Sequence, residues 1–171
     1  MKIFLTFGFG ASGGTSQVAL RWPSLYGDTK LKENRTKFKK NMFTVEQIEQ
    51  AHTKVKSGAD FPKYIQEIKI FGVKGFETWV KDSHTEYFGE KNFSTKSKSK
   101  YDELVISDNS NKENFIVQLK SHQQGKTDYF TFCIDCAETG IEKWVVRLDE
   151  MTCIYYDKKG NEILVEEIPQ L

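Results

Sequence analysis

The sequence matches itself when it is shifted along its own length by 68 residues. In both copies a stretch with helical spacing of apolar residues is followed by a glycine and then by alternating apolar residues. This shared pattern predicts two α-α-β-β units, at about 44–90 and 112–157, packed as one domain. Identities between the copies are few, and within 60–88 they are Asp60, Gly72 and Tyr87.

Capping residues and glycines mark where the predicted helices begin and end. Thr44 and Gln47 have the spacing of a capping box, and Gly58 can end the helix that they begin. Pro62 suits the first turn of a second helix, which Gly72 can end. The predicted helices lie at 44–57, 61–71, 112–124 and 127–138.

Alternation of apolar and polar residues replaces the helical period after Gly72 and predicts a β-hairpin that turns at Asp82 and Ser83. Leu104 to Ile106 can add a third strand, whereas the Ser-rich and Lys-rich residues 91–100 are typical of an exposed loop. The predicted strands lie at 73–80, 84–88, 104–106, 143–148, 151–156 and 162–166.

Together these elements predict an α+β fold with a mainly antiparallel sheet that helices cover on one face. Because side chains alternate across a strand, the hairpin register assigns each residue to a face. The face expected to meet the helices carries Phe76, Thr78, Val80, Thr85, Tyr87, Trp144, Val146, Leu148, Cys153 and Tyr155. The opposite face carries Glu77, Trp79, Lys81, His84, Glu86, Phe88, Val145, Arg147, Ile154 and Tyr156.

The composition is that of an ordinary folded domain with no strong charge. The chain is 38% hydrophobic, which is enough to form a core. Its 25 basic and 24 acidic residues nearly balance, so the protein has no overall electrostatic field that would attract nucleic acid. The sequence contains no apolar run long enough to span a bilayer, so no membrane association is expected. By composition we expect a poorly ordered extension over 1–41, which includes the basic stretch 30–40, and a single domain over 42–171.

Several segments resemble the YdfO-like (YbcV-like) family. They include Phe43-Thr44-Val45-Glu46-Gln47-Ile48, His84-Thr85-Glu86-Tyr87-Phe88-Gly89 and Glu142-Lys143-Trp144-Val145-Val146, and the resemblance covers about 42–169. It implies a small bacterial protein, prophage-borne in some members, of a kind sometimes labelled phage envelope protein. Family members begin near the position of Met42, which points to an upstream start for residues 1–41. The resemblance implies no catalytic motif.

Motifs for cofactors and metals lack the context that their chemistry needs. The glycines of residues 8–13 follow a strand-like stretch, but no helix and second strand follow them as in a dinucleotide-binding unit. Cys133, Cys136, Cys153 and His122 are ligand types for zinc, yet two of these cysteines occupy core positions of a helix. We therefore expect no cofactor and no metal, and thiols that stay reduced in the cytoplasm.

The leading functional hypothesis is a non-enzymatic binding or assembly module that uses the aromatic second face of the sheet. A homodimer partner, another protein or a small ligand could cover that face. The alternative is an acid/base enzyme centred on His84 with Glu77 or Glu86, and a third is a regulator that contacts nucleic acid through the basic stretch 30–40. The candidate binding residues are Glu77, Trp79, His84, Glu86, Phe88, Ile154 and Tyr156.

Overall fold

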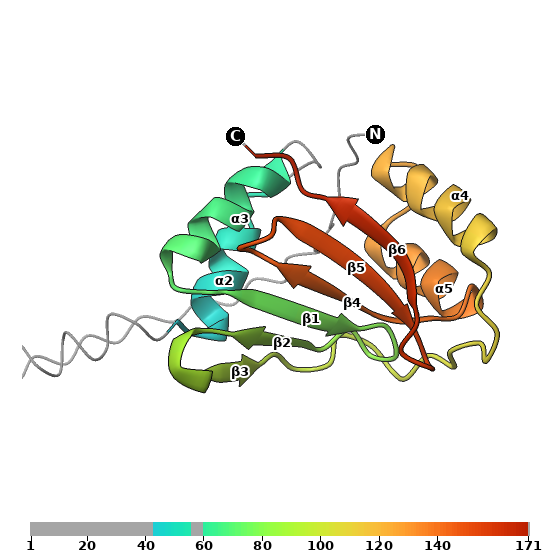
Figure 1. The fold of residues 1–171 in the computed structure, drawn as a ribbon, viewed down its shortest axis with the longest axis horizontal. Helices are drawn as coiled ribbons and strands as arrows, with labels where there is room; N and C mark the ends of the chain where they lie inside the picture. Colours follow the sequence, from blue (N-terminus) through green and yellow to red (C-terminus); the bar gives the residue numbers. More distant parts are fainter. Residues whose placement is uncertain (1–42, 56–59, 171) are drawn as a thin grey trace, which may run out of the picture.

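A computed structural model describes residues 43–55 and 60–170, so the predictions for the first 41 residues and for Gly58 lie outside the described residues. These residues form four α-helices and six strands, with α2 and α3 near one end of the sheet and α4 and α5 near the other (Figure 1). The helices are α2 (Val45–His52), α3 (Phe61–Ile70), α4 (Lys112–Gln123) and α5 (Tyr129–Glu138). The strands are β1 (Gly75–Trp79), β2 (Thr85–Phe88), β3 (Ser94–Lys96), β4 (Ile141–Arg147), β5 (Thr152–Asp157) and β6 (Glu162–Glu167).

The helices begin and end close to where local chemistry predicts. The Thr44 hydroxyl accepts a hydrogen bond from the Gln47 N–H, and the Gln47 side chain accepts one from the Thr44 N–H, which completes the predicted capping box. In α5 the Asp128 carboxylate accepts a hydrogen bond from the Thr131 N–H at 2.8 Å. The first helix is shorter than predicted, because α2 ends at His52 and a turn follows it.

All six strands form one antiparallel sheet in the order β3-β2-β1-β4-β5-β6. The α+β fold class is therefore confirmed. In the first hairpin the last strand pair is Thr78 with Thr85, after which the Trp79 N–H donates to the His84 carbonyl and Ser83 turns the chain with a positive φ of 57°. The central strands β1 and β4 come from the two predicted units and pair with Glu77 opposite Val145.

One predicted strand is wrong. Residues 104–106 form no strand, and the third strand of the first half is β3 instead, so that each half has the order α-α-β-β-β rather than α-α-β-β. Val105 is 92% exposed, while the Leu104 N–H donates to the Lys81 carbonyl and holds this segment against the hairpin turn. The three residues of β3 are polar and pair with β2, so no apolar alternation distinguished them from the predicted loop.

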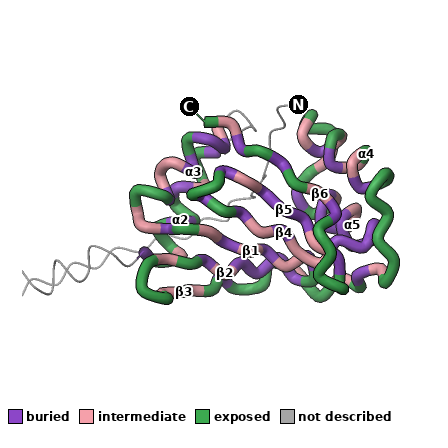
Figure 2. The backbone as a smooth tube through the Cα atoms, in the orientation of Figure 1, coloured by how far each residue is buried: buried purple, intermediate pink, exposed green. Residues whose placement is uncertain are grey.

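The ten residues predicted to face the helices are all buried, and we call their side of the sheet the inner face. Phe132 of α5 packs on Trp144 with ring centres 5.7 Å apart, and Phe115 of α4 packs on Tyr155 at 4.8 Å. Along β1 and β2 the exposure alternates (Figure 2), whereas Cys153, Ile154 and Tyr155 of β5 are all buried. Among the described residues, no helix has the length and apolar character needed to cross a membrane.

Candidate functional site

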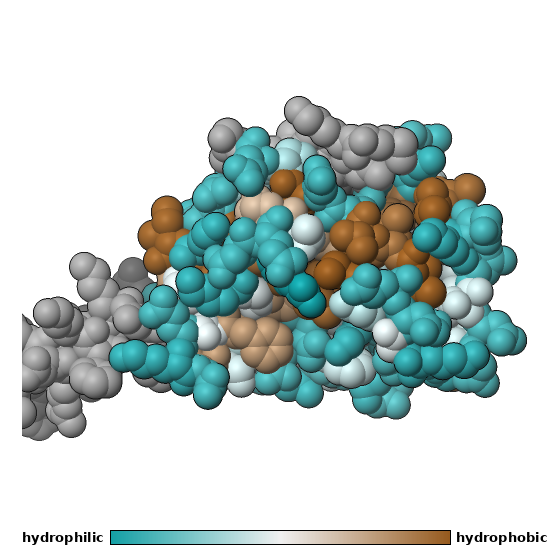
Figure 3. Space-filling model, in the orientation of Figure 1, coloured by the Kyte–Doolittle hydropathy of each residue, from teal (hydrophilic) through white to brown (hydrophobic). Residues whose placement is uncertain are grey.

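The predicted site residues lie on the side of the sheet opposite the inner face, which we call the outer face. Register places His84, Trp79, Lys143 and Tyr156 in one row across four neighbouring strands. Phe88 pairs with Gly75 at the other end of β1, so it does not lie beside Trp79. Phe88 is therefore separate from the other predicted apolar residues, whereas Val145, Ile154 and Val165 pair across β4, β5 and β6, the part of the molecule where hydrophobic side chains gather in Figure 3.

Trp79 is already covered by its neighbours. Its ring stacks on that of His84 at 6.0 Å, and the Lys143 ammonium lies 4.4 Å from the centre of the indole. That ammonium also forms an ion pair with Glu77 at 2.8 Å. Ile154 is only 5% exposed, which leaves Phe88 at 36% and Val165 at 51% as the large exposed hydrophobic residues of this face. The need for a partner over the outer face is smaller than predicted.

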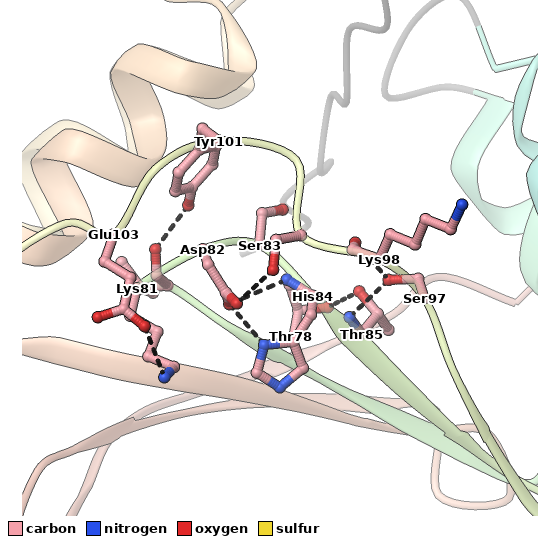
Figure 4. Close-up of polar contacts among 12 residues, drawn as sticks. Thr78, Lys81, Asp82, Ser83, His84, Thr85, Ser97, Lys98, Tyr101 and Glu103 are labelled. Carbon is pink, nitrogen blue, oxygen red and sulfur yellow. Dashed lines mark hydrogen bonds and ion pairs between the residues drawn. The ribbon is translucent and has the colours of Figure 1, made fainter.

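His84 is paired with Asp82 rather than with Glu77 or Glu86. Its Nδ1 donates to Asp82 Oδ1 at 2.5 Å, and Ser99 donates to Asp82 Oδ2 at 2.7 Å (Figure 4). Burial opposes ionisation of Asp82, but the hydrogen bonds from Ser99 and His84 outweigh it and lower the pKa of this carboxyl. An acid/base enzyme would therefore use Asp82, and not Glu77, as the carboxylate beside His84. The tight turn brings Asp82 to the imidazole, while Glu77 forms an ion pair with Lys143.

A pocket of about 380 Å³ lies on the inner face, between that face of the sheet and helices α2 and α3. We call it the inner pocket. Residues of the sheet, of both helices, of the segment after β3 and of α5 form its lining, so no single stretch of sequence contains it. Its aromatic lining residues are Phe61, Tyr64, Phe76, Tyr87 and Tyr129.

Hydroxyl groups line one wall of the inner pocket. Thr78 and Thr85 share a hydrogen bond of 2.9 Å between their hydroxyl oxygens, and the Ser97 hydroxyl accepts a hydrogen bond from the Thr85 N–H at 2.9 Å (Figure 4). Burial raises the pKa of Tyr87 to about 12, against hydrogen bonds with Thr85 and Tyr64 that lower it. The phenols are therefore neutral at physiological pH, and the wall offers donors and acceptors without charge.

Among the described residues, Glu49, His52 and Lys100 also line the inner pocket, and their side chains are ionisable. Lys100 as a whole residue is exposed, but its ammonium lies 5.4 Å from the centre of the Tyr129 ring, and burial lowers its pKa. Burial and then the charge of Lys100 lower the pKa of His52 to about 4, so that the imidazole is neutral near pH 7. His52 packs edge-on against Tyr64 with ring centres 5.0 Å apart.

Sequence reasoning missed the inner pocket because its residues carry no motif. Thr78 and Thr85 were correctly assigned to the inner face. The available signal was the 68-residue alignment, in which the two threonines meet Val146 and Cys153. Where one copy has a polar residue and the aligned position of the other copy has an apolar one, packing alone does not require the difference.

The three cysteines Cys133, Cys136 and Cys153 are buried free thiols. Burial raises the pKa of Cys133 to about 11 and also raises the pKa values of Cys136 and Cys153, which keeps all three protonated. Across the described ranges, His, Cys, Asp and Glu side chains nowhere gather in groups of three or more that could hold a metal ion.

The fold and the inner pocket define an α+β protein with a six-stranded antiparallel sheet and a pocket between that sheet and two helices. A family model matches residues 49–167, and the chain belongs to that family, which is described as Protein of unknown function (DUF1398). A comparison with curated proteins found no match.

Proposed function

We propose that this chain is a non-enzymatic binding module that holds a small molecule in the inner pocket. The observation that carries the proposal is a cavity of about 380 Å³ lined by five aromatic side chains and a few polar groups that converge on it. Sites for small ligands have this character, with mostly apolar walls and a small number of polar groups that fix orientation.

An internal duplication supports the proposal, and we propose that both halves derive from one α-α-β-β-β unit whose helices cover one face of the sheet. The two halves present the same order of elements. Glu77 pairs with Val145, which is its own counterpart at an offset of 68 residues, as a two-fold relation between the halves requires. The second half then serves as an internal reference for the first.

The second half has apolar residues at the positions that are polar in the inner pocket. Where the first half has Thr78 and Thr85, the second has Val146 and Cys153, and all four residues are buried. A buried hydroxyl stabilises a fold less than a methyl group of the same size, unless it is needed for a hydrogen bond. The Thr78 and Thr85 hydroxyls satisfy each other with a hydrogen bond of 2.9 Å, and they support the proposal because they place polar groups on the inner pocket where the second half has apolar ones.

Two tryptophan variants of α2 test whether the inner pocket binds ligands. Thr53 lines the inner pocket and is exposed, so Thr53→Trp should fill its entrance, while Gln50→Trp places the same ring on α2 away from the lining. We expect saturation-transfer NMR with a panel of small aromatic compounds to detect binders of the wild type and of Gln50→Trp, and none of Thr53→Trp. The proposal is wrong if no compound binds the wild type, or if both variants bind equally.

Other predictions from the sequence remain proposals with less support. We propose a cytoplasmic location on the basis of the three free thiols, and a prophage origin on the family resemblance alone. Contact of the outer face with a second copy or another protein is supported by the exposure of Val165 and Phe88. An acid/base role would now rest on the pair of His84 and Asp82.

A further inference from the structure

The charges around the inner pocket indicate which ligands it selects. We infer that the inner pocket takes an aromatic carboxylate, whose ring lies among the aromatic side chains and whose anionic group meets the Lys100 ammonium. The inference rests on the proposed function and adds the chemical class of the ligand.

Among the described residues that line the inner pocket, Lys100 supplies the positive charge. His52 is neutral because burial lowers its pKa to about 4, and burial raises the pKa values of the tyrosines, so that their phenols are neutral as well. Glu49 is the negative charge of the lining, and it lies exposed on α2. Water screens the exposed carboxylate. Lys100 is an exposed residue as well, but its ammonium lies over the Tyr129 ring, which withdraws part of it from water.

A partly desolvated ammonium favours an anion over a neutral group. Burial lowers the pKa of Lys100, which means that the folded protein holds this charge at a cost in solvation. A bound carboxylate would offset that cost, because charge attraction is stronger where water is excluded. A cation would add a second positive charge beside the first and would gain only the screened attraction of Glu49.

The uncharged lining favours a planar ring with a polar substituent. Aromatic side chains from α3, β1, β2 and α5 surround the space, and rings pack against one another edge-on or offset with favourable energy. The hydroxyls of Thr78 and Thr85 can exchange part of their mutual hydrogen bond for one with the ring substituent. An aliphatic acid of the same charge would use neither feature.

Three probe compounds share an indole ring and differ in charge, so they separate the effect of ligand charge on affinity from that of ring shape. Indole-3-acetate is an anion, indole-3-acetamide is neutral and tryptamine is a cation at pH 7. We expect calorimetric titration to show at least tenfold tighter binding of indole-3-acetate than of the other two. Lys100→Met should remove that preference and leave the affinity for the amide within about twofold. Lys98→Met, at an exposed neighbouring lysine that does not line the inner pocket, should change neither.

The outcomes distinguish this inference from the proposed function. Equal affinities for the three probes, or a preference that survives in Lys100→Met, would overturn the aromatic carboxylate while leaving a ligand pocket. Tightest binding of tryptamine, lost in Glu49→Gln, would also overturn it in favour of a cation. If other aromatic compounds bind in the inner pocket and the three indoles do not, the class is wrong. Absence of all binding overturns the proposed function itself.

Discussion

Glu166 is a carboxylic acid held inside the protein, with 8% of its surface exposed. Gln123 donates to both of its oxygens at 3.3 Å, and the Tyr155 hydroxyl donates to one of them at 3.3 Å. Burial nevertheless dominates and raises the pKa of the carboxyl above its usual value of 4.5. Ionisation of Glu166 therefore costs more free energy in the folded chain than in the unfolded chain.

The raised pKa of Glu166 should make part of the stability of the fold depend on pH. The contribution of Glu166 is fully present below the pKa that it has in the unfolded chain, and it is lost as pH rises through the raised pKa of the folded chain. Glu166→Gln removes the ionisation and keeps an acceptor for Gln123 and Tyr155. We expect thermal unfolding at pH 7 to show a midpoint a few degrees above the wild type.

The gain should disappear below about pH 4, where the carboxyl is protonated in both states. Glu167→Gln, at the exposed next residue of β6, should leave the midpoint unchanged at either pH. A Glu166→Gln protein that is less stable than the wild type at pH 7 would show instead that the ionised carboxylate stabilises the fold.

At the scale of elements, two glycines in left-handed conformation stand at different kinds of turn. Gly140 joins α5 to β4 with a φ of 79°, and Gly160 turns the chain between β5 and β6 with a φ of 78°. A methyl group on Gly140 would lie 2.6 Å from the Asn109 carbonyl oxygen, whereas one on Gly160 would meet nothing within 4 Å. A substitution at either glycine would strain the backbone, but of the two only Gly140 lies close to another segment of the chain.

Alanine substitutions at Gly160 and Gly140 separate the cost of backbone strain from the cost of close packing. We expect Gly160→Ala to lower the free energy of unfolding by about 1 kcal/mol, which is the cost of the left-handed conformation alone. Gly140→Ala should cost about 3 kcal/mol, because the segment at Asn109 must also move away. Urea denaturation of both variants measures the difference. Equal losses would mean that the chain at Asn109 shifts freely and does not hold the end of α5.

At the scale of the whole molecule, the two faces of the sheet respond differently to charge. Trp144 is fully buried under α5 on the inner face, whereas Trp79 is half-buried on the outer face beside Lys143. Removing a core tryptophan costs about 3 to 5 kcal/mol, and a buried carboxylate adds to that loss. The same carboxylate at position 79 lies within reach of an ammonium.

We expect Trp144→Asp to lose its circular dichroism signal of folded structure and Trp79→Asp to keep it. Sedimentation velocity of the wild type and Trp79→Asp then tests the outer face as a contact surface, since a charge there should weaken any self-association. An unfolded Trp79→Asp together with a folded Trp144→Asp would reverse the assignment of the two faces.

Features that depend on a few neighbouring residues were predictable from the sequence. Thr44 and Asp128 begin helices because their side chains cap N–H groups only three residues away. Gly72 and Gly140 have the positive φ values expected where the helices end. The inner face followed from alternation, because a strand turns successive side chains to opposite sides whatever surrounds it.

Features that depend on the turn geometry and on distant segments were decided only by the tertiary structure. Residues 94–96 become a strand because β2 offers them an edge, and their own residues have no apolar pattern. Asp82 reaches His84 because Ser83 adopts a left-handed turn, which two-residue spacing does not reveal. The inner pocket brings together residues between Ile48 and Tyr129 that only packing places side by side. A cavity is a space that packing leaves unfilled, so it has no counterpart in the order of residues along the chain.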